Sequence, residues 1–211
     1  MRTALFDLDG TLIDHFRAIH RSHAHTMRTL GLPPPTMDQV RAAVGGGLEL
    51  ALARLVGPDR VAAALAIYRP YWDATLLDDA EVMPGARELL AALRDRGVRC
   101  AVLTNKRGDS SRLLCAHLGL APLLDGVFGA GDRAWLKPAP EFTAHALREL
   151  DASAAEACLV GDSPWDVAAA QNAGLAFFGV TTGTHTAAEL RAAGATQVFA
   201  NLAEVAAAMA V

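Results

Sequence analysis

The sequence predicts an α/β protein with a doubly wound parallel sheet and a small all-helical domain inserted near its N-terminus. Short runs that are apolar on both faces alternate along the chain with longer helical patterns. Continuous apolar runs are typical of parallel strands that are covered on both sides. One long stretch interrupts this alternation with helical patterns alone. Strand–helix alternation favours the doubly wound sheet, and the interruption favours an insertion.

The expected strands and helices follow one another in a regular order. Strands are predicted for the apolar runs 4–8, 98–104, 157–160 and 175–180. Helices are predicted between and after them, over 85–96, 109–118, 140–150 and 164–173. Three of these helices are followed at once by a glycine, at Gly97, Gly119 and Gly174, which is a common way for a helix to end.

Residues 15–81 contain no convincing strand. Apolar positions at helical spacing predict a helix from Phe16 to Leu30, and further helices are expected over 36–44, 48–56 and 60–77. The last should be kinked or split at Pro70. We therefore expect a helical cap domain over 15–81, and a core domain made of 1–14 and 82–211.

Composition and charge exclude several classes of partner. The 211 residues are 52% hydrophobic and carry a net charge of −4, so no basic field favours nucleic acid or an anionic membrane. No segment approaches the ~20 apolar residues of a membrane span. The cysteines are odd in number and lie in apolar stretches, as expected of reduced core thiols: Cys100, Cys115 and Cys158. We expect a cytoplasmic protein, a monomer or a homodimer.

An acidic pair follows the first predicted strand, in Asp7-Leu8-Asp9-Gly10-Thr11. Side chains two apart on an extended chain point the same way, so Asp7 and Asp9 can face one pocket. Their mutual repulsion, ~4 kcal/mol at close range, would be relieved by a cation or by protonation. The alternative is an Asp-Gly turn that only ends a strand.

Three further segments lie at or beyond predicted strand ends, where open parallel sheets bind their ligands. Thr104-Asn105-Lys106 offers a hydroxyl, an amide and a cation, and Lys137 lies on a loop with prolines. Asp162 and Asp166 lie in a segment that enters a helix. Taken singly, they also fit a loop start, a surface lysine and a helix cap.

Taken together, these four segments resemble the motifs of the haloacid dehalogenase-like superfamily. The first motif reads Asp7-x-Asp9-Gly10-Thr11-Leu12, the second is Thr104, the third is Lys137, and the fourth is Gly161-Asp162-x-x-x-Asp166. The resemblance covers essentially the whole chain and implies a Rossmann-like core with a helical cap. Within the superfamily, three stretches are similar to phosphoglycolate phosphatases: 104–106, 41–48 and 183–195.

The resemblance implies a role for each motif. Asp7 would attack phosphorus and carry the phosphoryl group, and Asp9 would protonate the leaving alkoxide and then activate water. Mg²⁺ would be bound by Asp7, the Asp9 carbonyl, Asp162 and, through water, Asp166. Thr104, the Asn105 N–H and Lys137 would surround the transferred oxygens.

The expected activity is therefore that of a Mg²⁺-dependent phosphomonoesterase acting on a small metabolite, with phosphoglycolate favoured. A β-phosphoglucomutase-like sugar-phosphate mutase, a pyrophosphatase and a broad hexose-phosphate phosphatase stay open. Asp9 argues against dehalogenase chemistry, and the absence of lysine from residues 15–81 excludes a Schiff base on the cap. A non-catalytic binding protein of the same fold is the alternative from another class.

Substrate choice is expected to lie in the cap. Backbone N–H groups of Gly45, Gly46 and Gly47 precede a predicted helix, where they can bind a substrate carboxylate, with Arg41 as a cation for it. The alternatives are a flexible hinge and a solvated arginine. His15 departs from the family pattern at the exit from the core. A metal site is less expected than solvent-facing or substrate-adjacent imidazoles for His20, His23 and His25.

Overall fold

The computed structural model describes residues 1–210 and contains one six-stranded sheet in the order β5-β4-β1-β6-β7-β8. Every neighbouring pair in it is parallel. The fold class expected from the sequence is confirmed. The strands are β1 (Thr3–Phe6), β4 (Arg99–Arg107), β5 (Gly126–Ala130), β6 (Ala157–Gly161), β7 (Ala176–Val180) and β8 (Val198–Phe199).

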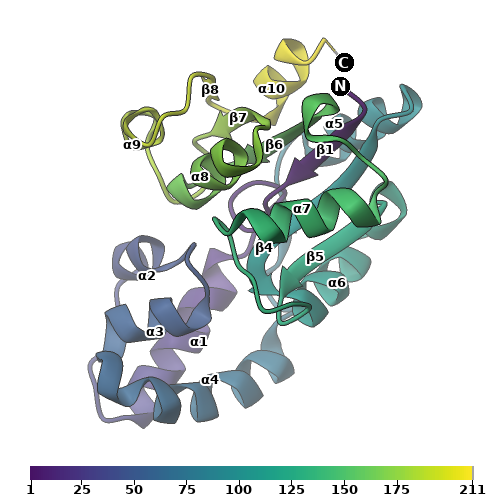
Figure 1. Ribbon diagram of the computed structural model, residues 1–211. Coiled ribbons are helices and arrows are strands. Elements are labelled where there is room, and N and C mark those ends of the chain that lie inside the picture. The colour runs from purple at the N-terminus through teal and green to yellow at the C-terminus, as the bar shows by residue number, and fades with distance from the viewer. Residues whose placement is uncertain (211) are drawn as a thin grey trace.

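Helices cover both faces of the sheet (Figure 1). Ala4 and Phe6 of β1 belong to one apolar cluster, whereas Leu5 between them belongs to another, because side chains alternate across a strand. The first cluster includes residues of α5 (Ala86–Asp95), α6 (Gly108–His117) and α10 (Leu202–Ala208). The second includes residues of α7 (Pro140–Glu149) and α8 (Pro164–Ala173). A short helix, α9 (Ala187–Ala192), packs beside α8.

The inserted stretch forms a group of helices on one side of the sheet (Figure 1). These are α1 (Phe16–Thr29), α2 (Met37–Ala43), α3 (Leu48–Val56), the short 3₁₀ turn Pro58–Arg60 and α4 (Val61–Thr75). α4 continues through Pro70 as one helix. The segments that enter and leave the group pair as antiparallel strands β2 (Ile13–Asp14) and β3 (Glu81–Val82).

The structure adds elements that the sequence patterns did not predict. β5 and β8 are edge strands, and β8 and β3 are only two residues long. β5 has two glycines and side chains that are mostly half-buried, so it lacks the apolar run of a central strand. Two 3₁₀ turns, Ala121–Leu123 and Ala154–Glu156, precede β5 and β6. An edge strand depends on its neighbour more than on its own sequence.

The sheet order decides where a ligand can bind. The chain passes from β1 to β4 and β5 on one side and then returns to β6 on the other side of β1. This reversal opens a crevice beyond the carboxyl ends of β1, β4 and β6. All three cysteines are buried and free, as expected from the sequence. Within residues 1–210, no helix is long and apolar enough to cross a membrane.

Candidate active site

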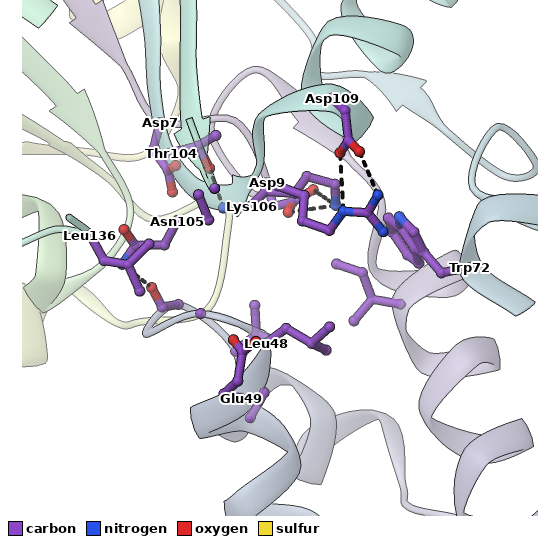
Figure 2. Close-up of a pocket in the computed structure, with 18 of the residues that line it drawn as sticks. Asp7, Asp9, Leu48, Glu49, Trp72, Thr104, Asn105, Lys106, Asp109 and Leu136 are labelled. Atoms are coloured by element: carbon purple, nitrogen blue, oxygen red, sulfur yellow. Dashed lines mark hydrogen bonds and ion pairs between the residues drawn. The ribbon is translucent and has the colours of Figure 1, made fainter. Parts of the chain in front are cut away.

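The catalytic and ligand-binding residues predicted from the sequence lie together at the carboxyl ends of the three central strands. Asp7 directly follows β1, Thr104 and Asn105 lie in the last part of β4, and Asp162 directly follows β6. Because β1 pairs with both β4 and β6, these segments are neighbours in space. Figure 2 shows Asp7, Thr104 and Asn105 side by side at this edge.

A buried lysine joins two carboxylates at the centre of the site. Lys137 Nζ lies 2.8 Å from Asp7 Oδ1 and 2.5 Å from Asp166 Oδ1. The lysine is 3% exposed and Asp166 is fully buried, so neither charge is solvated by bulk water. Burial alone would lower the pKa of Lys137, but Asp166 and Asp7 together raise it above its ordinary value. The lysine therefore carries a fixed positive charge next to Asp7.

The buried acids carry more negative charge than Lys137 offsets. Burial raises the pKa of Asp7 to about 6, against the effect of Lys137 and with that of Asp166. Burial also raises the pKa of Asp162 to about 8, and the charges of Asp7 and Asp166 add to it. Carboxylates without enough cations near them become hard to ionise. The cluster thus has the charge balance of a site that takes up a further cation.

Asp162 is held in place by two threonines. Its Oδ1 accepts a hydrogen bond from Thr11 Oγ1 at 3.3 Å, and its Oδ2 accepts from the backbone N–H of Thr184 at 2.8 Å. The neighbouring Gly183 comes so close that a Cβ there would lie 1.9 Å from Asp162 Oδ2. Only glycine fits at this position, so the loop after β7 determines how the Asp162 carboxylate is oriented.

The acidic cluster fits a divalent cation with oxygen ligands. Asp7, Asp162 and Asp166 each offer a carboxylate oxygen, and these oxygens lie within 4.8 Å of one another. Asp7 Oδ1 is buried and has Lys137 Nζ as its partner, at 2.8 Å. Asp166 is already bonded to Lys137 and, through Oδ2, to the Ser163 N–H. Both oxygens of Asp162 also accept hydrogen bonds, so Asp7 is the freest of the three carboxylates.

Asp9 has two basic neighbours of its own. Lys106 Nζ lies 2.9 Å and 3.1 Å from its carboxylate oxygens, and His15 Nδ1 lies 3.7 Å from Oδ1. Burial alone would raise the pKa of Asp9, but Lys106 and His15 hold it well below its usual range. His15 is completely buried, and its Nε2 bonds to the Leu76 carbonyl oxygen at 2.7 Å. His15 thus links Asp9 to the end of cap helix α4.

The side chains of Thr104 and Asn105 form hydrogen bonds with main-chain groups around the site. Thr104 Oγ1 accepts a hydrogen bond from the Lys106 N–H at 3.2 Å. The Asn105 side chain bonds to the main chain of Lys137 and donates through Nδ2 to the Gly45 carbonyl at 3.0 Å. Asn105 therefore connects the core motif, the lysine loop and the cap, and its side chain is already engaged in these three hydrogen bonds.

A cavity of about 790 Å³ lies between the core residues and the cap. Figure 2 shows Leu48 and Glu49 of α3 across the cavity from Asp7 and Thr104, with Trp72 of α4 on another side. Of the cap residues proposed from the sequence, Gly45 and Gly47 line this cavity. Gly46 packs against Trp165 of the core. The glycine segment thus contacts the core in two ways, through the Asn105–Gly45 hydrogen bond and against the Trp165 ring.

Arg41, His20 and His25 do not line the cavity, whereas His23 does. The Arg41 guanidinium lies 4.7 Å from the centre of the Phe16 ring and donates to the Gly183 carbonyl at 3.3 Å. His20 bonds to the Pro35 carbonyl oxygen, and His25 stacks on Tyr71. His23 lines the cavity. In the described part of the chain, none of these histidines joins a group of three metal-binding side chains.

The comparisons with known proteins agree with this geometry. The family model described as haloacid dehalogenase-like hydrolase matches residues 4–180. The chain belongs to this family. It is 37% identical over 195 residues to the probable phosphatase IndB of Dickeya dadantii, a match that covers 90% of this chain and 85% of the relative. It is 35% identical over 192 residues to a phosphoglycolate phosphatase of Rhodobacter capsulatus, covering 85% and 84%.

Solved structures of the family have the same fold. A predicted phosphatase from Clostridium acetobutylicum superposes with a TM-score of 0.91 at 26% identity, over 99% of this chain and 98% of that one. The resemblance stated from the motifs, including its phosphoglycolate phosphatase-like subgroup, is confirmed. The family member described here is a hydrolase of the phosphatase type.

Some residues of the site had no role assigned from the sequence. Lys106 was noted as part of the second motif, but its contact with Asp9 was not expected. Thr184 was noted only within a stretch of subfamily similarity, and Thr11 only within the first motif. Their roles depend on contacts between segments far apart in the chain, such as the Thr11–Asp162 hydrogen bond. No local pattern indicates such a pairing.

Proposed function

We propose that the protein is a Mg²⁺-dependent phosphomonoesterase that works through an aspartyl-phosphate on Asp7, with phosphoglycolate as the favoured substrate. One observation carries the proposal: Asp7 lies in a carboxylate cluster with its Oδ1 2.8 Å from Nζ of the buried Lys137. A nucleophile with a free lone pair, next to a fixed cation and a metal-type ligand set, suits attack on phosphorus.

Each residue has a distinct task in the proposed reaction. Asp7 forms the bond to phosphorus as the bond to the leaving oxygen breaks. Asp9 must first take up a proton, against the effect of Lys106 and His15 on its pKa. It delivers this proton to the leaving oxygen and regains one from the water that cleaves the aspartyl-phosphate. Lys137, the Thr104 hydroxyl and the Asn105 N–H offset charge on the phosphoryl oxygens. The leaving group lies in the cavity below the cap.

Asp7, Asp162, the Asp9 carbonyl and, through water, Asp166 would hold the metal ion. Bound there, Mg²⁺ supplies charge neutralisation between the nucleophile and the phosphoryl group, two anions that otherwise repel. The raised pKa values of Asp7 and Asp162 support this assignment, because ionising both acids costs free energy until a cation is present.

Further parts of the proposal concern the protein's organisation. We keep residues 15–81 as a cap domain and 1–14 with 82–211 as the core, a division supported by the short β2–β3 pair at the junction. A cytoplasmic location fits three free cysteines. A monomer or a homodimer stays a prediction. Phosphoglycolate is favoured because relatives with that name match most of this chain.

The test is phosphate release, with Mg²⁺ and with EDTA, from phosphoglycolate, hexose phosphates, nucleotides, pyrophosphate and p-nitrophenyl phosphate. A large kcat/KM preference for phosphoglycolate supports the full proposal. A preference for pyrophosphate or a hexose phosphate would change the proposed substrate and leave the proposed phosphatase mechanism in place. Isomerisation of a sugar phosphate without phosphate release would identify a mutase, and no reaction at all would favour a non-catalytic protein.

A further inference from the structure

Five lysine and arginine side chains line the cavity, and most of them are neutralised at its rim. Arg69 pairs with Glu49 at 3.1 Å, Arg107 with Asp73 at 3.0 Å, and Arg112 with Asp132 at 2.9 Å. These pairs are partly exposed, so solvent screens them as well. Arg133 is exposed to solvent. The remaining cation is Lys106.

Lys106 is the least exposed cation of this group. Its side chain is 9% exposed, and Nζ lies 4.4 Å from the centre of the Trp72 ring as well as beside Asp9. Trp72 is fixed in turn by a hydrogen bond of 3.1 Å from Nε1 to Ser110 Oγ. Figure 2 shows Lys106 between Asp9 and Trp72. The ammonium group is therefore held at the inner end of the cavity, between the proton donor and the cap.

The position of Lys106 relative to Asp9 defines what it can contact. In the proposed reaction Asp9 is hydrogen-bonded to the leaving oxygen, and Lys106 Nζ is hydrogen-bonded to both oxygens of the same carboxylate. A group that reaches Lys106 must therefore lie close to the leaving oxygen. In a small phosphoester, this is a substituent attached to the ester carbon itself.

We propose that Lys106 is a specificity-determining residue that binds a carboxylate attached directly to the ester carbon of the substrate. The inference rests on the proposed phosphatase function and defines its substrate class as 2-phosphorylated short hydroxy acids. It assigns the carboxylate to the core lysine and not to Arg41, which lies over Phe16 and bonds to Gly183. Lys106 and the rim arginines all have acid partners, but the Lys106 side chain is only 9% exposed, and solvent screens a charge less there than at the rim.

The experiment compares two substrates of almost equal size, phosphoglycolate and 2-hydroxyethyl phosphate, which lacks the carboxylate charge. Lys106→Met removes the charge and keeps an unbranched side chain, and Lys106→Arg keeps the charge. Arg69→Met is the matched control, because it removes a cation of the cavity rim. kcat and KM are measured for each protein with Mg²⁺, and p-nitrophenyl phosphate reports the chemistry without a carboxylate.

The wild-type protein should prefer phosphoglycolate in kcat/KM, and Lys106→Met should reduce that preference by about 10- to 100-fold, mainly through KM. Lys106→Arg should restore part of it, and Arg69→Met should leave it unchanged. Equal losses for both substrates in Lys106→Met would overturn the inference and leave Lys106 acting on Asp9 alone. A preference that survives in Lys106→Met would also overturn it and favour the Gly45–Gly47 segment.

A binding measurement separates this inference from the proposed function. Calorimetry with the Asp7→Asn protein and Mg²⁺ gives the Kd of both phosphates without turnover. Weaker phosphoglycolate binding, specifically after Lys106→Met is added, supports the carboxylate contact even if the reaction proves to be a different one. Equal Kd values for the two phosphates in Asp7→Asn would overturn the inference, while Mg²⁺-dependent release from p-nitrophenyl phosphate would leave the phosphatase proposal standing.

Discussion

The Asn105 side chain bonds in both directions to the main chain of Lys137. Its Oδ1 accepts from the Lys137 N–H at 2.7 Å, and its Nδ2 donates to the Lys137 carbonyl at 3.0 Å. The same Nδ2 donates to the Gly45 carbonyl of the cap. An amide is needed here, because one end must accept a hydrogen bond while the other end donates two. The position of the catalytic-type lysine thus depends on this one side chain.

Asn105→Asp should destabilise the protein by about 2 to 4 kcal/mol. The change places a carboxylate oxygen against two carbonyl oxygens in a nearly buried position, and it leaves both carbonyls without a donor. The midpoint of urea unfolding at pH 7.5 measures the loss. Asn172→Asp is the matched control, since Asn172 donates to the Pro138 carbonyl of the same loop from an exposed position. Similar losses for the two variants would contradict the explanation.

Asp7→Asn should reduce phosphate release by at least about 10⁴-fold, because the amide cannot attack phosphorus. The fold should be unchanged, since Asn and Asp have the same shape and Lys137 keeps Asp166 as its partner. Steady-state kinetics with p-nitrophenyl phosphate and a circular dichroism spectrum check both parts. A residual rate within about tenfold of the wild-type rate would exclude Asp7 as the nucleophile.

Asp162→Asn should stabilise the metal-free protein at pH 8. The folded protein raises the pKa of Asp162 from its ordinary value of 3.8 to about 8, so this acid contributes stability below pH 4 that is lost as the pH rises through 8. An amide avoids the charge and can still accept from Thr184 and donate to Thr11. We expect a gain of about 2 to 4 kcal/mol in EDTA at pH 8, and a smaller gain at pH 5.

The same variant should lose the response to Mg²⁺. Thermal unfolding is measured with EDTA and with 10-fold steps of Mg²⁺ for the wild-type protein and the variant. An ion that binds only the folded protein raises Tm. Wild-type Tm should rise with Mg²⁺, and Asp162→Asn should show little change. A Tm rise of equal size in the two proteins would remove Asp162 from the set of metal ligands.

The wild-type protein should become less stable in acid through His23. Burial lowers the pKa of His23 to about 4, so the folded protein binds its proton more weakly than the unfolded chain does. The stability that the neutral imidazole contributes is present above pH 6.5 and is lost as the pH falls toward 4. Between pH 7 and pH 5 the expected loss is about 2 kcal/mol.

His23→Leu should remove most of that acid-dependent loss, because leucine fits the apolar contact with Tyr68 and does not titrate. Urea unfolding at pH 7 and pH 5 compares the two proteins. His25→Leu is the control, since His25 stacks on Tyr71 in a half-buried position of the same helix. If both histidine variants keep the wild-type pH dependence, other groups cause the loss.

Central elements could be predicted from local patterns, and peripheral ones could not. β1 and β6 are continuous apolar runs with buried side chains, and α8 matches its predicted range from Pro164 to Ala173. β5 and β8 lie at the edges, where half-exposed, glycine-containing or very short segments give little periodicity. Pro70 shows the converse, since a kink or a split was expected there and α4 is not split but runs through the proline as one helix.

The sequence by itself determined the fold class, the family and the order of the motif residues, because apolar periodicity and closely spaced carboxylates are local properties. Only the tertiary structure decided which cation lies beside Asp9. Arg41 was the cation expected from the sequence, yet it bonds to Gly183, whereas Lys106 reaches Asp9, which is distant in sequence. Such contacts depend on how strands and helices pack. A contact between side chains distant in sequence produces no pattern in the residues next to either of them.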